Sequence, residues 1–371
     1  MTDSLTVFIV DDDPSVRDAL GLLLAGSSTG FSLEFDVTLR PVLLLSFFAA
    51  VGLSANLALL RQGGKRLLLF VMVLAPFLVL QNLTGLLLAW SLDLHPLMGL
   101  IGGTITLVGG HGTGAAYAER FAEVHNIQAI MELAMTGATL GLVLGGLCGG
   151  PLAQWLIRRH RLAGADGHAT EVQPSGDGDA APISAASLVP VLAAVLIAVL
   201  AGQWLAELVS DAPVTLPSFL WCLLLGALIR NGGHLIGLRL NDAAIELISG
   251  LALALFLAMT MMALNLASVA SLAGPLLLIL LGQVVVVLVY GGALVYRAVG
   301  RDYESAVMSA AFCGFALGAT ATAIANMQAI VQKYGPAPQA FLVVPLVGAF
   351  LIDLINALVL TGFLSLPGLG G

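Results

Sequence analysis

Long apolar stretches dominate the chain, and the short segments between them carry most of its charged residues. About 20 consecutive apolar residues, each rising about 1.5 Å in a helix, cross the hydrocarbon core of a bilayer. The pattern therefore predicts membrane-spanning helices rather than the half-apolar faces of a soluble domain. The predicted spans cover residues 41–60, 67–92, 133–157, 180–206, 212–229, two spans within 247–296, and 341–364.

Two further apolar stretches, at 94–118 and 305–332, are interrupted by glycine and threonine. The first contains the run GGHGTG at 109–114, and each glycine inside a helix costs about 1 kcal/mol relative to alanine. Opened backbone at membrane depth is tolerated only where it is buried in protein or lines a watery cavity. We therefore expect each stretch to form a re-entrant hairpin whose tip exposes backbone groups to a solute. A glycine-rich contact between helices is the alternative explanation for the first stretch.

Composition agrees with a membrane protein and excludes other classes. Charged residues make up 10% of the 371 residues, the mean hydropathy is +1.01 and the net charge is −8, whereas a soluble domain carries about 25% charged residues. No basic cluster predicts nucleic-acid binding. No nucleophile elbow, phosphate loop or metal-ligand cluster predicts an enzyme. The three cysteines lie in apolar runs without metal-type spacing, so we expect them to be small core residues.

Residues 1–40 differ in kind from the rest of the chain. A short β-type run ends at three consecutive aspartates, 11–13, and a helical pattern follows, so residues 1–26 resemble the start of a response-regulator receiver domain. The later phospho-acceptor strand, the switch threonine and the lysine of that family are missing. Because one strand and one helix cannot bury a core, we interpret 1–40 as a receiver-like fragment and lead-in without a signalling function.

Arginine and lysine gather in four loops, and the spans alternate without conflict if all four loops are cytoplasmic. This orientation predicts a first membrane half at 41–161, a cytoplasmic linker at 162–183 and a second half at 184–371 with a periplasmic C-terminus. The first hairpin would then enter the membrane from outside and the second from inside. The two halves would have inverted topology.

The two halves also match in sequence, since Asn56 corresponds to Asn265 and Gln81 to Gln283, at offsets of 209 (265 − 56) and 202 (283 − 81). The second half contains two spans before its matching region, where the first half has only the receiver-like fragment. Internal symmetry therefore predicts that the first repeat lacks two N-terminal helices.

Three motifs resemble the bacterial sodium/glutamate symporter (ESS) family: GGHGTGAAY at 109–117, GATATAIANM at 318–327 and FLVVPLVGAFLID at 341–353. The resemblance implies an all-α polytopic protein of the inner membrane, with two inverted-topology repeats and one re-entrant hairpin in each. It also implies Na⁺-coupled uptake of L-glutamate. Ala321 departs from the family, which has proline between the two threonines of the second loop. The alternatives are a Na⁺-coupled transporter of another small carboxylate, and an inactive truncated or fused gene product.

We expect the two hairpin tips to meet near the middle of the membrane and to form the binding site. Half-helix N-termini suit the carboxylates of glutamate, while opened carbonyls with Thr and Asn oxygens suit Na⁺. The candidate substrate- and ion-binding residues are Gly110, His111, Gly112, Thr113, Gly114, Gly318, Thr320, Thr322, Asn326, Asp353, Asn56 and Asn265. The Na⁺ ligands within this set are not assigned.

Several of these residues have a structural interpretation beside the functional one. His111 would bind a substrate carboxylate or brace the tip, and Asn56 and Asn265 would coordinate ions or join helices. Asp353 is an acid inside an apolar span, which points to Na⁺ coupling or to a buried structural acid. Arg120, beside the first hairpin, would attract glutamate or be a solvated charge. We expect no catalytic residue and no cofactor other than the coupling ion. The expected partners are L-glutamate, Na⁺, the lipid bilayer and a second copy of the chain.

Overall fold

The computed structural model describes residues 38–366, apart from 61–62, 126, 128, 163–182, 210–215, 234–236, 239 and 263–272. All regular elements in this part of the chain are helical, and five of the helices are long and apolar enough to cross a membrane. This confirms the predicted all-α polytopic membrane protein. The receiver-like fragment, most of the predicted linker and Asn265 lie outside the described residues.

The helices follow the predicted order. Before the linker they are α2 (Arg40–Ser54), α3 (Leu57–Leu60), α4 (Gly64–Ser91), α5 (Pro96–Leu100), the π-helix η2 (Ile101–Ile105), α6 (Gly110–His125) and α7 (Ile130–His160). After it come α8 (Ala185–Leu208), α9 (Ser218–Gly232), α10 (Asp242–Met262), α12 (Ala273–Tyr290), η4 (Gly291–Val295), α13 (Tyr296–Val299), α14 (Tyr303–Leu317), α15 (Thr320–Tyr334), α16 (Pro338–Leu346), η5 (Val347–Leu351) and α17 (Ile352–Leu364).

The predicted continuous span at 41–60 is wrong, because α2 ends at Ser54 and the short helix α3 follows. Asn231 of α9 holds this break: its Nδ2 donates to the carbonyl oxygen of Ala55 at 2.6 Å, and its Oδ1 accepts from the Leu57 N–H at 2.9 Å. The side-chain oxygen of Asn56 accepts from Ala58 at 3.1 Å and caps α3. Backbone groups released by the break therefore find side-chain partners.

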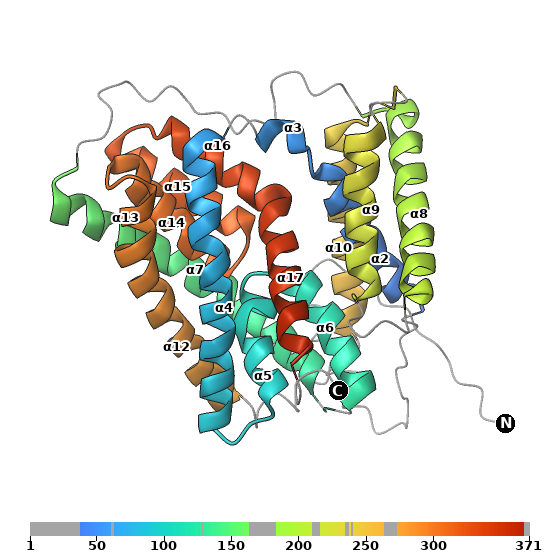
Figure 1. Ribbon diagram of the computed structural model, residues 1–371, viewed down its shortest axis with the longest axis horizontal. Coiled ribbons are helices and arrows are strands. Elements are labelled where there is room, and N and C mark those ends of the chain that lie inside the picture. Colours follow the sequence, from blue (N-terminus) through green and yellow to red (C-terminus); the bar gives the residue numbers. More distant parts are fainter. Residues whose placement is uncertain are drawn as a thin grey trace, which may run out of the picture.

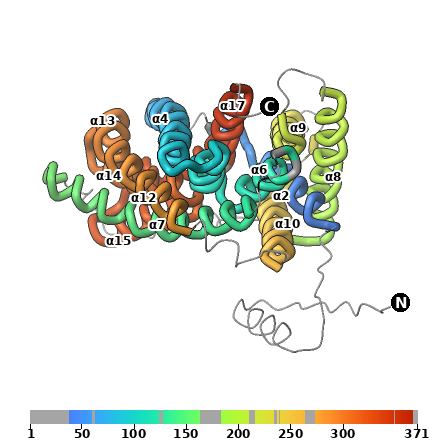
Figure 2. The backbone as a smooth tube through the Cα atoms, turned by 90° about the horizontal axis from the view of Figure 1, so that it is seen from below, coloured from blue at the N-terminus to red at the C-terminus, as the bar shows by residue number. Residues whose placement is uncertain are grey.

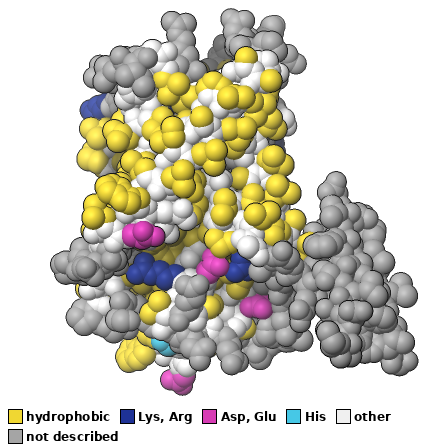
Figure 3. Space-filling view, turned by 90° about the vertical axis from the view of Figure 1, so that its right-hand side faces the viewer, with side chains coloured by type: hydrophobic (Ala, Val, Ile, Leu, Met, Phe, Trp, Pro, Cys, Tyr) yellow, Lys and Arg dark blue, Asp and Glu magenta, His cyan; other side chains and the backbone are white. Residues whose placement is uncertain are grey.

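The helices form two groups (Figures 1 and 2). One group contains α2, α8, α9 and α10, which pack on one another, and the second contains α4, α7 and α12 to α15. In the view of Figure 1, α6 and α17 lie between the two groups. Hydrophobic side chains cover most of the upper part of the face shown in Figure 3, and charged side chains gather below them. Such a surface fits an apolar membrane environment.

A stripe of glycines on α7 lets the second group pack closely. A methyl group at Gly141 would clash with the Leu317 carbonyl oxygen, and one at Gly145 would lie 3.3 Å from the Leu317 β-carbon. At Gly149 a methyl would collide with the amide of Asn326. These glycines therefore allow a close helix approach, and the neighbour is the pair α14 and α15.

Candidate functional site

The first glycine-rich stretch folds as two helical arms, α5 with η2 and then α6, and its backbone opens at two points. Gly103 leaves helical geometry inside η2 (φ −101°, ψ −136°), and a turn at Val108–Gly109 leads into Gly110, which has φ +62°. Only glycine adopts that positive φ without strain. π-Helical turns such as η2 are frequent at functional sites.

The open segment is shorter than the sequence predicts, because Gly112 and Gly114 lie inside α6. Their lack of a side chain serves packing instead. A β-carbon at Gly112 would lie 2.7 Å from the Phe47 ring, and one at Gly114 would lie 3.3 Å from the Thr106 methyl group. The helix tolerates these glycines because close packing offsets their low helix propensity.

The second stretch consists of α14 and α15, joined by Gly318 (φ −149°, ψ −100°) and by Ala319, which is extended (φ −158°, ψ 171°). Every residue of α14 except Glu304 is buried. The N-cap position of α15 is Ala319, whose methyl group cannot accept a hydrogen bond from the first turn. The start of α15 therefore presents N–H groups that a side chain does not satisfy.

The two connections lie next to each other. A β-carbon built at Gly110 would lie 4.0 Å from the carbonyl oxygen of Gly318. In Figure 1, α5 and α6 occupy the lower part of the molecule and α14 and α15 the upper part. Residues about 200 positions apart thus bring two opened backbone segments together, as expected for tips that share one site.

Of the four predicted residues, the three threonines and Asn326, two donate side-chain hydrogen bonds to backbone. Thr320 donates its hydroxyl to the Gly348 carbonyl oxygen at 3.0 Å. Asn326 donates to the carbonyl oxygens of Gly145 and Ala310 at 3.0 and 3.1 Å, so it ties α15 to α7 and α14. Thr113 is buried and Thr322 is half-buried.

His111 and Asp353 differ in their surroundings. His111 is half-buried, and its Nε2 lies 3.0 Å from the hydroxyl of Thr139. Because Thr139 donates that hydroxyl to the Met135 carbonyl oxygen, the imidazole Nε2 acts as donor to it. Asp353 lies in the first turn of α17, directly after the π-helix η5. Within the described part of the chain, Asp353 has no hydrogen bond and no ion pair.

Four buried amides were not among the predicted site residues: Gln81 and Asn82 of α4, Gln283 of α12 and Asn356 of α17. Each is at most 1% exposed. Gln81 donates to the Ala316 carbonyl oxygen at 2.7 Å, two residues before Gly318. Gln283 donates to the carbonyl oxygen of Gln81 at 2.9 Å. The sequence match between Gln81 and Gln283 in the internal repeat could have indicated these two residues. That match did not suggest a function for them.

A charged cap positions the second hairpin where α14 begins. Asp302 accepts from the Ser305 N–H at 2.9 Å and forms an ion pair with Arg66 of α4. Burial alone would raise the pKa of Asp302, but the hydrogen bonds from Ser305 and Arg66 hold it below the ordinary value. The ionised carboxylate therefore fixes the entry of α14 relative to α4.

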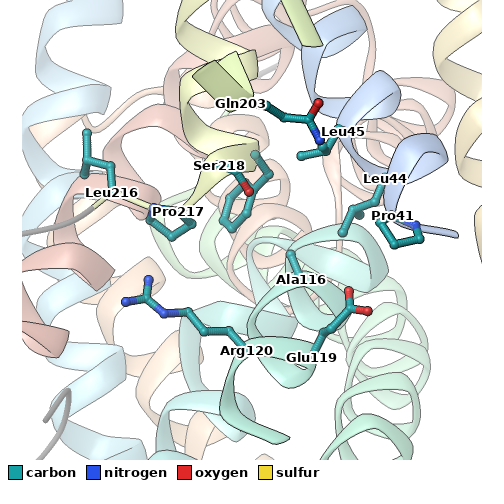
Figure 4. Close-up of a pocket in the computed structure, with 11 residues that line it drawn as sticks. Pro41, Leu44, Leu45, Ala116, Glu119, Arg120, Gln203, Leu216, Pro217 and Ser218 are labelled. Carbon is teal, nitrogen blue, oxygen red and sulfur yellow. The ribbon is translucent and has the colours of Figure 1, made fainter. Parts of the chain in front are cut away.

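A cavity of about 430 Å³ lies between the far end of α6 and the helices α2, α8 and α9 (Figure 4). Glu119 and Arg120 of α6 both line it. Glu119 forms an ion pair with Arg40 at 2.9 Å, whereas Arg120 has no ion pair or hydrogen bond among the described residues. Figure 4 shows the two side chains pointing apart, with the guanidinium of Arg120 on the side of Leu216 and Pro217.

Comparison with known proteins agrees with the resemblance in the motifs. A sequence model of the sodium/glutamate symporter family matches residues 15–336. The sodium/glutamate symporter of Escherichia coli (strain K12) is 43% identical over 365 residues, which cover 95% of this chain and 89% of that protein. The sodium/glutamate symporter of Haemophilus influenzae is 41% identical over 348 residues, covering 92% of this chain and 86% of that protein. The chain therefore belongs to the sodium/glutamate symporter family.

Proposed function

We propose that the connections at Gly110 and Gly318 are the tips of two re-entrant hairpins that jointly bind glutamate and Na⁺. Family membership makes the chain a Na⁺-coupled glutamate symporter of the inner membrane, and a transporter rather than an enzyme. The observation that supports this site most strongly is the close approach of Gly110 and Gly318. A β-carbon built at Gly110 would lie 4.0 Å from the carbonyl oxygen of Gly318. Opened backbone at the meeting point of two chain halves is typical of transporter sites.

The helix directions at the tips suit a dicarboxylate. α6 begins at Gly110 and α15 begins at Thr320, so two helix N-termini start at the meeting point. Each N-terminus carries free N–H groups and roughly half a positive charge. Glutamate has two carboxylates, and one N-terminus for each would bind both without burying a fixed cation.

Asp353 gives the site an acid close to the second tip. The Thr320 hydroxyl contacts Gly348 in η5, and Asp353 follows η5 directly. An acid in this position is suited to pair with the ammonium group of glutamate or with Na⁺. His111, Thr322 and Asn326 complete the proposed set around the tips, and Asn56 and Asn265 complete that of the matched spans.

We also propose the finer topology: two inverted repeats, a cytoplasmic linker, a periplasmic C-terminus and a homodimer. The position of α5 and α6 opposite α14 and α15 in Figure 1 supports hairpins that enter from opposite faces. Homodimer formation would be tested by crosslinking in the membrane.

Uptake of radiolabelled glutamate into proteoliposomes, driven by a Na⁺ gradient, tests the proposed site. Thr113→Ala should raise the KM for glutamate or Na⁺ roughly tenfold, because a hydrogen bond to a charged group contributes about 1.5–3 kcal/mol. Thr113→Ser keeps the hydroxyl and should transport like the unmodified chain. Unchanged kinetics in Thr113→Ala would remove this residue from the site, and absence of uptake by the unmodified chain would contradict the function itself.

A further inference from the structure

We propose that the four buried amides Gln81, Asn82, Gln283 and Asn356 form a Na⁺ site around the kink of the first hairpin, separate from the two tips. The proposal rests on the Na⁺ coupling of the proposed function and assigns ligands outside the residues that the motifs predict. We call these four residues the amide cage.

The amides surround the opened backbone at Gly103 and Thr104. Asn82 accepts from the Thr104 N–H at 3.0 Å and from its hydroxyl at 2.9 Å. Asn356 donates to the Thr104 carbonyl oxygen at 3.2 Å. A β-carbon built at Gly103 would lie 2.9 Å from Oδ1 of Asn82 and 3.6 Å from the carbonyl oxygen of Gln81, which accepts from Gln283. Three helices, α4, α12 and α17, thus place amides at one kink.

The cage has more unpaired acceptors than unpaired donors. In the described part of the chain, Oε1 of Gln81, Oε1 of Gln283 and Oδ1 of Asn356 are buried without a hydrogen-bond donor, whereas Nδ2 of Asn82 is buried without an acceptor. Each unsatisfied buried polar group costs about 1–3 kcal/mol. Three buried oxygens without a donor lie around one kink, in a protein with few buried polar side chains. We therefore infer a ligand that binds oxygen atoms. Na⁺ is a hard cation of that type.

Neutral amides suit a coupling ion better than a ring of carboxylates would. When the ion leaves, no buried anion remains, so the empty state does not carry the large cost of an unpaired charge in the membrane. A single water molecule donates only two hydrogen bonds, whereas one cation can bind all three oxygens.

The cage also connects the two hairpins. Asn82 and Asn356 hold the first hairpin at Thr104, and Gln81 holds the second at Ala316, two residues before Gly318. A cation bound here would fix both hairpins at once, so glutamate would meet a pre-organised pair of tips. Reciprocal coupling between Na⁺ and glutamate follows from this linkage.

The test measures the thermal stability of the purified full chain over a series of NaCl concentrations, without glutamate and at constant ionic strength with KCl. Na⁺ should raise the Tm of the unmodified chain and K⁺ should not. Gln283→Met keeps the side-chain length but removes the oxygen, and should raise the half-maximal Na⁺ concentration about tenfold or more. Gln283→Glu keeps an oxygen and should retain the Na⁺ response. Gln154→Met, on the outer part of α7, is the matched control and should respond like the unmodified chain.

Hydrogen exchange of the unmodified chain supplies a second measurement that does not depend on a variant folding. Na⁺ should slow exchange of the peptide covering 97–108 relative to K⁺. An unchanged Na⁺ response in Gln283→Met, or no protection of 97–108, overturns the cage. Na⁺-driven glutamate uptake that persists beside such a result would leave the hairpin site intact, so the two proposals fail separately.

Discussion

Glu119 and Arg120 are neighbours on α6, yet only one of them is paired among the described residues. Glu119 forms an ion pair with Arg40, and Arg120 lines the cavity beside α9 without an ion pair. A half-buried guanidinium in a cavity raises the local concentration of anions. The cavity lies at the end of α6 away from the tip, so we interpret it as the entrance for glutamate on that side.

Replacing Arg120 tests this interpretation. Arg120→Gln should raise the KM for glutamate about three- to tenfold with kcat little changed, since a partly solvated charge contributes about 1 kcal/mol. Higher salt should shrink the difference by screening. Arg297→Gln removes an exposed arginine of α13 and is the control. Equal KM values for the unmodified chain and Arg120→Gln would assign the arginine to a solvated surface.

At the same scale, the sequence predicts the candidate site residues but not the hydrogen bonds that they form. The motif glycines and threonines could be predicted because broken helices and hydroxyls are rare in apolar spans. The amide cage could not, because Gln81 and Gln283 acquire partners only when α4 packs against α12 and α14. The sequence predicts that His111 binds a substrate carboxylate or braces the tip, but it does not indicate the partner found in the structure, the hydroxyl of Thr139.

At the scale of elements, the glycine stripe of α7 is the feature on which the second hairpin docks. Gly141→Ala should destabilise the protein by about 1–3 kcal/mol, because the new methyl group would overlap the Leu317 carbonyl oxygen. Gly146→Ala is the control on the same helix, where the nearest atom is the Thr322 methyl at 3.9 Å. That change should be neutral or stabilising through helix propensity.

Thermal unfolding in detergent, followed by size-exclusion chromatography of the heated sample, would measure the Tm of both alanine variants. An equal Tm for Gly141→Ala and Gly146→Ala would mean that α7 does not dock closely on α14. Because Gly141 packs against Leu317, next to Gly318, glutamate uptake by Gly141→Ala should fall together with its stability.

Most helices can be predicted from hydropathy, but the positions at which a helix is interrupted are harder to predict. The helices α4, α7 and α8 follow long uncharged runs, so the span rule finds them. The end of α2 at Ser54 escaped prediction, because the break is held by Asn231, which lies 176 positions from Ala55. A local sequence pattern cannot predict a hydrogen-bond partner that is so distant in the chain.

At the scale of the whole molecule, the helices divide into a group of α2, α8, α9 and α10 and a group of α4, α7 and α12 to α15 (Figure 2). Hydropathy predicted that these helices exist, but which helices join which group depends on interhelical contacts. The two chain halves approach each other at Gly110 and Gly318, and the shared binding site that the internal symmetry predicts there stays a prediction.

The most direct test of the account is the side of the membrane from which each tip can be reached. His111→Cys and Thr320→Cys would be treated in oriented vesicles with a membrane-impermeant thiol reagent from one side at a time. The unmodified chain, with Cys148, Cys222 and Cys313 free, would set the background. The account predicts that position 111 reacts from the periplasmic side and position 320 from the cytoplasmic side, and that glutamate with Na⁺ slows both reactions. Labelling of both positions from one compartment alone, or of neither after the vesicles are opened, would contradict it.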